Sequence, residues 1–199
     1  MKKWIVIFLF SASALALQAQ TVFRLNQYNI IYNGSFMPVF TLYGGQSFSE
    51  HWGLSTYFYV NGTKGSSWGE GLAGPTYMPF KGLSISFLAG FQTNEDQLFR
   101  VSPIVSYSGK KFSGFASFEY GGERHRWDIM VFYLMKQFKA GGELIRFYKM
   151  YAAGPRVEFS FFKKQPLTIF YSGLWDWVNG KPVSMFGLYS SFLPKKTGM

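Results

Sequence analysis

From residue 23 onward, short segments alternate apolar and small polar residues, with Gly, Asn, Lys and Pro between the segments. They lie near residues 23–32, 36–46, 52–60, 69–79, 83–91, 98–107, 112–120, 127–137, 142–150, 153–162, 167–175 and 183–192. A period of two is the pattern of β-strands, which place successive side chains on opposite faces of a sheet. After residue 19, no segment approaches the roughly twenty consecutive apolar residues of a spanning helix. The pattern predicts about twelve antiparallel strands, with ten as the alternative count.

The two sets of side chains differ most clearly in residues 99–107 and 153–162. In the first segment, Phe99 and Val105 share one face, and Arg100 and Ser102 share the other. In the second, Val157, Phe159 and Phe161 oppose Arg156, Glu158 and Ser160. We expect the apolar sets to face lipid and the polar sets to face a lumen. Residues 129–135 are apolar on both faces, so alternation does not assign them.

The first nineteen residues have the organisation of an export signal. Lys2 and Lys3 precede an apolar stretch from Trp4 to Leu17, and Ala19 ends a plausible cleavage site before Gln20. The stretch is too short for a spanning helix. We therefore predict a signal peptide at residues 1–19 and one domain at residues 20–199.

Composition favours a surface in lipid. Aromatic residues make up 21% of the chain and charged residues only 15%, and the aromatic residues are interleaved with Ser, Gly and Thr. A secreted soluble β-protein is the alternative, with those residues in its core. The chain has no Cys and only two His, so we expect no disulfide, metal site or cofactor. Without Lys2 and Lys3 of the predicted signal, 18 basic and 10 acidic residues remain, and this surplus lies mostly in turns, which does not indicate a nucleic-acid surface.

The connections suggest an orientation in the membrane. The shorter set lies near residues 80–82, 109–110, 140–142 and 163–166, and the longer set near 61–68, 92–97, 121–126 and 176–181. Outer-membrane barrels have short periplasmic turns and longer external loops. Most turn lysines fall on the short side: Lys81, Lys110, Lys111, Lys139, Lys163, Lys164, Lys195 and Lys196. Carboxylates fall on the long side: Glu95, Asp96, Glu123 and Asp176.

These features together resemble a Gram-negative outer-membrane β-barrel protein. The resemblance rests on the export signal, the aromatic alternating strands, short turns such as residues 107–112, and a last strand that ends in Phe192. The Leu-Gln-Ala-Gln junction at residues 17–20 is similar to export signals of Bacteroidota. The resemblance implies a transmembrane, antiparallel, up-and-down β-barrel, with membrane lipids and the barrel assembly machinery as partners. It implies no functional residues.

Charged residues on the predicted inner face are the candidate pore residues. A two-residue turn at Gly109 and Lys110 places Arg100 opposite Glu119, and extending the register places Glu119 opposite Asp128. A hairpin turn at residues 151–152 would bring together a second group, Arg146, Arg156 and Glu158. Both groups fit either a salt-bridged plug or a polar constriction that selects small solutes.

Two further readings concern the external rim. Trp175 and Trp177 could stack on a sugar at the outer mouth, but aromatic residues of the membrane interface are the simpler interpretation. His125, with Ser117 nearby, is the only external candidate for a hydrolase or acyltransferase site, and no pattern supplies the third group of such a site. A histidine in a surface loop is the simpler reading, and we predict no enzymatic activity.

The sequence thus predicts a porin-like, small-solute channel with a charged lumen in the cell outer membrane. A non-conducting barrel that belongs to an envelope complex is the alternative. A lipid hydrolase or acyltransferase barrel is a third, weaker reading.

Overall fold

A computed structural model describes residues 21–63, 65–93, 98–121, 125–147, 149–162 and 167–192. Its elements are β1 (Thr21–Tyr32), β2 (Ser35–Ser47), β3 (Trp52–Asn61), β4 (Trp68–Phe80), β5 (Leu83–Gln92), β6 (Phe99–Ser108), β7 (Phe112–Glu119), β8 (Arg126–Met135), β9 (Phe138–Phe147), β10 (Met150–Phe161), β11 (Leu167–Asp176) and β12 (Lys181–Phe192). Among the described residues, no helix is both long and apolar enough to cross a bilayer. The predicted signal peptide lies outside the described residues and stays a prediction.

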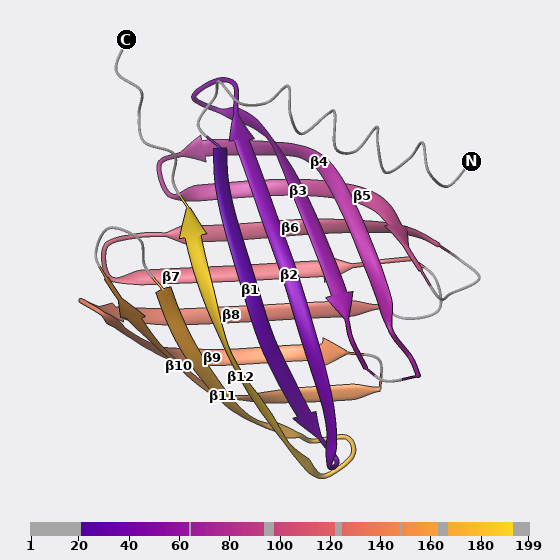
Figure 1. The fold of residues 1–199 in the computed structure, drawn as a ribbon. Helices are drawn as coiled ribbons and strands as arrows, with labels where there is room; N and C mark the ends of the chain where they lie inside the picture. Colours follow the sequence, from indigo (N-terminus) through magenta and orange to yellow (C-terminus); the bar gives the residue numbers. More distant parts are fainter. Residues whose placement is uncertain are drawn as a thin grey trace.

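The strands form one closed, antiparallel barrel. Each strand pairs with the next in sequence, and β1 closes the barrel by pairing with β12, where Tyr28 lies opposite Gly187. Figure 1 shows β1 and β2 running steeply across the front while β8 and β9 cross behind them. Closure leaves no edge strand, so the ladder can satisfy the backbone hydrogen bonds of every strand. This confirms the predicted fold class and the count of twelve strands.

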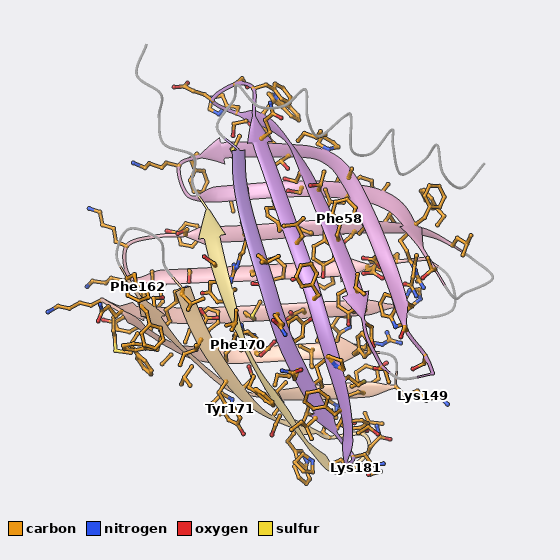
Figure 2. All side chains as sticks on the ribbon, in the orientation of Figure 1. Phe58, Lys149, Phe162, Phe170, Tyr171 and Lys181 are labelled. Carbon is orange, nitrogen blue, oxygen red and sulfur yellow. The ribbon has the colours of Figure 1, made fainter. Side chains whose placement is uncertain are left out.

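Side chains alternate between the two faces as predicted. Figure 2 labels two neighbours in β11, Phe170 and Tyr171. Phe170 is 7% exposed inside the barrel, whereas Tyr171 is 49% exposed on its outer surface. In β6, Arg100 and Ser102 are buried while Phe99 is exposed. The exposed outer surface is thus mainly apolar and aromatic, as lipid contact requires.

The structure also assigns β8, whose sequence is apolar on both faces. Val131 and Tyr133 are exposed on the outside, whereas Phe132 is buried inside. The inward Phe132 ring lies 5.9 Å from the Arg156 guanidinium carbon and 5.9 Å from Lys139 Nζ. The face of an aromatic ring attracts cations. Phe132, although apolar, can therefore stabilise the charged groups on the inner wall of the barrel.

Two of the predicted turns lie elsewhere in the structure. The connection between β8 and β9 is at residues 136–137, where Lys136 has a positive φ of 39°, and not at residues 140–142. Gly141 instead lies inside β9, where an added Cβ would be 1.9 Å from the Val131 carbonyl oxygen. The glycine permits close approach of two backbones and does not mark a loop. The next connection consequently lies at residues 148–149 and not at 151–152.

Turn length separates the two rims less clearly than predicted. The rim with residues 62–67, 93–98 and 120–125 also has two short connections, at 33–34 and 148–149. Asn33 and Gly34 both have positive φ, as a tight two-residue hairpin needs. β1 begins and β12 ends at the opposite rim, as an even number of strands requires. We call the rim of residues 33–34 and 148–149 the outer rim, in keeping with the predicted orientation.

We expect Val131→Arg to lower the free energy of unfolding by about 2–4 kcal/mol, because it places a charge on the lipid face near mid-strand. The matched control is Met130→Arg, since Met130 lines the interior opposite Glu143 in the ladder. Its arginine would gain a carboxylate partner, so the loss should be much smaller. Urea unfolding in lipid vesicles measures both values. Equal losses would show that the assignment of faces in β8 is wrong.

Candidate functional site: the barrel lumen

The interior of the barrel contains a cavity of about 390 Å³. Tyrosines of the first three strands line one wall: Tyr28, Tyr43, Tyr57 and Tyr59. Charged residues of the later strands line the facing wall: Glu119, Arg126, Asp128, Glu143 and Arg156. Small polar side chains of β6 and β7, including Ser102 and Ser117, complete it. Hydroxyls, aromatic rings and charges of both signs therefore surround the same space.

Near the outer rim, Arg126 is the centre of a group of four charges. It forms ion pairs with Glu119 and with Glu70, the latter at 3.1 Å. Arg100 is fully buried, with its Nε 4.0 Å from Glu119 Oε1. Two guanidinium groups and two carboxylates balance one another, which offsets the large cost of burying charge.

The predicted register around this group is wrong by two residues. Glu119 lies opposite Arg126, not opposite Asp128, and Asp128 lies opposite Ser117. On the other side, Ser117 pairs with Ile104, so Arg100 is not directly opposite Glu119. The Gly109 N–H bonds to the Phe112 carbonyl, which makes this turn longer than the predicted two residues. A shift of two preserves the face, so the predicted side chains still point inward, with different partners.

A second charged group lies further along the lumen. Arg156 Nη1 donates to both carboxylate oxygens of Glu143 at 3.2 Å, and its Nε donates to Glu158 at 3.0 Å. Lys139 Nζ donates to Glu158 and to the Tyr189 hydroxyl, both at 3.0 Å. Lys139 was predicted in a periplasmic turn, but it lies inside β9. Arg156 and Glu158 thus meet as predicted, with Glu143 and Lys139 as partners that the sequence reading missed.

Asp128 is placed differently from the other carboxylates. It lines the cavity, and its Oδ1 is buried without a hydrogen-bond partner among the described residues. It lies opposite Ser117 and Ile145 in the two ladders. Asp128 therefore leaves one oxygen free to accept a hydrogen bond from a molecule inside the lumen.

Arg146 is not a lumen residue, which corrects the prediction. It pairs with Trp127 and with Tyr151 in the neighbouring strands, and its guanidinium lies 4.9 Å from the Tyr151 ring centre. The residues of β9 that line the cavity beside Arg146 are Glu143, Ile145 and Phe147. Arg146 alternates with these residues along the strand, so it takes the outward face.

Side chains that meet across the barrel narrow the lumen beside the charged group around Arg126. The Arg126 guanidinium from β8 lies 4.4 Å from the ring centre of Tyr59 in β3. Tyr59 stacks on Trp68 with ring centres 4.7 Å apart, and Trp68 stacks on Phe147 of β9 at 6.3 Å. Since β3 and β4 are distant from β8 and β9 around the barrel, these contacts join opposite walls.

The two predicted mouth aromatics do not line the lumen. Trp175 is 54% exposed on the same outward face of β11 as Tyr171. Trp177 follows the strand and lies against Tyr151, with ring centres 6.2 Å apart. Asp176, predicted in an external loop, is instead fully buried and accepts a hydrogen bond from the Tyr32 hydroxyl at 2.7 Å. The arrangement favours the interface interpretation of both tryptophans.

The residues of the enzymatic reading are not brought together. His125 lies against Tyr120 at the rim, with ring centres 5.4 Å apart. Ser117 lines the cavity and pairs in the ladder with Asp128. Within the described part of the chain, no group of three or more His, Cys, Asp or Glu residues could hold a metal ion.

No family model and no curated protein matches the sequence. Solved structures do match the fold. A KdgM porin is 14% identical with a TM-score of 0.59, covering 85% of this chain and 99% of that chain. A NanC porin is 16% identical with a TM-score of 0.54, covering 84% of this chain and 98% of that chain. The CymD monoaromatic hydrocarbon channel is 7% identical with a TM-score of 0.52, covering 90% of this chain and 89% of that chain.

At these identities, what is shared is the fold. The closed ladder and the apolar outer surface define this chain as a twelve-stranded β-barrel with the fold of these outer-membrane porins and channels.

We expect Arg126→Gln and Glu70→Gln to be coupled by about 0.5–3 kcal/mol in a double-mutant cycle of unfolding free energies, because their side chains meet across the lumen. A control cycle pairs Arg126→Gln with Glu50→Gln, an exposed turn residue at the opposite rim. That cycle should be additive. Additivity of the Arg126 and Glu70 changes would contradict the contact across the lumen.

Proposed function

We propose that the protein is a porin-like channel of the outer membrane that lets small solutes pass passively through its charged lumen. The observation that carries this proposal is the cavity of about 390 Å³, enclosed by the barrel and lined by tyrosine hydroxyls and charged groups. Its volume falls within the range of about 300–1,000 Å³ of small-molecule sites. The similar structures named porins and a hydrocarbon channel support the same function.

The charge balance favours neutral or weakly charged solutes. Arg126 and Arg100 face Glu70 and Glu119, while Arg156 and Lys139 face Glu143 and Glu158. Arg24 and Asp128 also line the cavity and have opposite signs. One KdgM porin structure is described as a complex with disordered oligogalacturonate. The balanced lumen here does not favour an acidic oligosaccharide of that kind, since no continuous basic surface is present on its described walls.

A non-conducting structural barrel within an envelope complex is the second candidate. The contacts that join Arg126 and Tyr59, and Trp68 and Phe147, favour it because they occupy the lumen near the outer rim. Its partners would be other envelope proteins. For a solute to pass through the barrel, it would need either a path beside these contacts or a movement of the side chains that form them.

The remaining partners follow from the membrane setting. We expect contact with membrane lipids and insertion by the barrel assembly machinery, after export directed by residues 1–19. The similarity of the Leu-Gln-Ala-Gln junction to Bacteroidota signals predicts the source group.

We expect the protein to fractionate with outer membranes and to migrate differently on gels with and without boiling, because closed barrels resist detergent until heated. Fractionation of cells that express the full chain tests the location. Recovery as a soluble protein after gentle lysis would exclude the outer-membrane location.

The reversal potential in a planar bilayer under a salt gradient tests the channel. Arg156→Gln leaves Glu143 and Glu158 with one cation fewer, so we expect a shift toward cation selectivity. Glu143→Gln removes one negative charge from the same group, and we expect a shift in the opposite direction. The heat-dependent gel shift confirms folding of both variants. A wild-type barrel without measurable conductance would favour the non-conducting alternative.

A further inference from the structure

Four residues are neighbours at the outer rim, and we call them the rim patch: Trp127, Arg146, Tyr151 and Trp177. Trp127 and Tyr151 flank Arg146 in the two neighbouring ladders. Their rings are 6.3 Å apart in an edge-to-face arrangement, and Tyr151 also contacts Trp177. All four lie within two residues of a strand end. The rim patch therefore lies where the hydrocarbon of the membrane meets the headgroups.

The guanidinium of Arg146 has little to neutralise it. Among the described residues it forms no ion pair, and its Nε is buried without a hydrogen-bond partner. Its guanidinium lies 4.9 Å from the centre of the Tyr151 ring, which supports the cation but provides no negative charge. The cations of the lumen, Arg126 and Arg156, each have two carboxylate partners. An anion for Arg146 must therefore come from outside the described chain.

The surroundings of Arg146 are held in place by Asp176. This buried carboxylate accepts hydrogen bonds from the backbone N–H groups of Tyr151, Val178 and Asn179. The Asn179 side chain also donates to the Lys149 carbonyl at 3.1 Å. The connection at residues 148–149 and the turn at residues 177–180 are thus joined beside the rim patch. Figure 2 shows Lys149 and Lys181 at this same end of the barrel, so further cations are available there.

We propose that the rim patch, with Lys149, binds a phosphate group of the glycolipid in the outer leaflet of the membrane. A guanidinium can donate two hydrogen bonds to a phosphate at once, and flanking aromatic rings pack against the sugar and the first methylenes of such a lipid. The charge is complementary, because the Asp176 carboxylate is turned inward to Tyr32. Arg146, Tyr151 and Trp177 do not line the cavity, whereas Trp127 does. The proposed site requires the outer-membrane location and the predicted orientation, but not conduction.

The test uses the full barrel purified in detergent and native mass spectrometry. The probes are a bisphosphorylated glycolipid and the same glycolipid without its phosphates. We expect wild type to prefer the phosphorylated probe, and Arg146→Gln to weaken binding by about five-fold, since one cation near a headgroup contributes about 1 kcal/mol. Lys81→Gln, which removes an exposed lysine from the opposite rim, is the matched control and should bind like wild type.

Equal binding of the two probes by wild type, or unchanged binding by Arg146→Gln, would overturn the proposal. Lys149→Gln provides a second test, because its exposed side chain is outside the ladder and its loss should not prevent folding. We expect it to weaken binding in the same direction. Conductance of the same preparations is measured separately. A barrel that binds the lipid but does not conduct would contradict the proposed channel function and leave the proposed lipid site supported.

Discussion

The structure depends on one requirement of the membrane: each backbone N–H and C=O in the hydrocarbon must have a partner inside the protein. Pairing of β1 with β12 meets this requirement by removing the two edges that an open sheet would expose. Closure then fixes the two faces of every strand, since the period of two sends alternate side chains to lipid and to the lumen. As a consequence, Phe170 is buried inside the barrel and its neighbour in sequence, Tyr171, is exposed on the outer surface.

Inside the barrel, charge compensation determines which side chains meet. A buried carboxylate without a partner costs far more than a buried ion pair with good geometry. In the observed register Glu119 lies opposite Arg126, whereas the register we predicted would place it opposite Asp128. The same requirement explains why Arg126 extends to Glu70 on the far wall, because one guanidinium can satisfy two carboxylates. The contact across the lumen thus follows from electrostatics as much as from shape.

Much of the fold could be predicted from the sequence, because alternation of residues such as Phe99 and Arg100 reports directly on the face of a strand. The register could not, since shifting a hairpin by two residues leaves every face unchanged and alters only the partners. Alternation also does not assign the faces of residues 143–146, because each face has one charged and one apolar residue. Arg146 is for this reason wrongly predicted in the lumen. Glu70 was missed because glycines flank it and hide the alternation.

Arginine has two different roles in this barrel, and its surroundings account for both. Arg126 and Arg156 lie in an enclosed lumen, where the chain itself must provide the opposing charge, and carboxylates of neighbouring or facing strands do so. Arg146 lies at the end of a strand on the outside, where an aromatic ring supports the cation. An enclosed carboxylate there would compete with the headgroups for the same cation. No carboxylate of the described residues pairs with Arg146, which in our proposal keeps its charge available for the membrane surface, whereas the same omission in the lumen would destabilise the barrel.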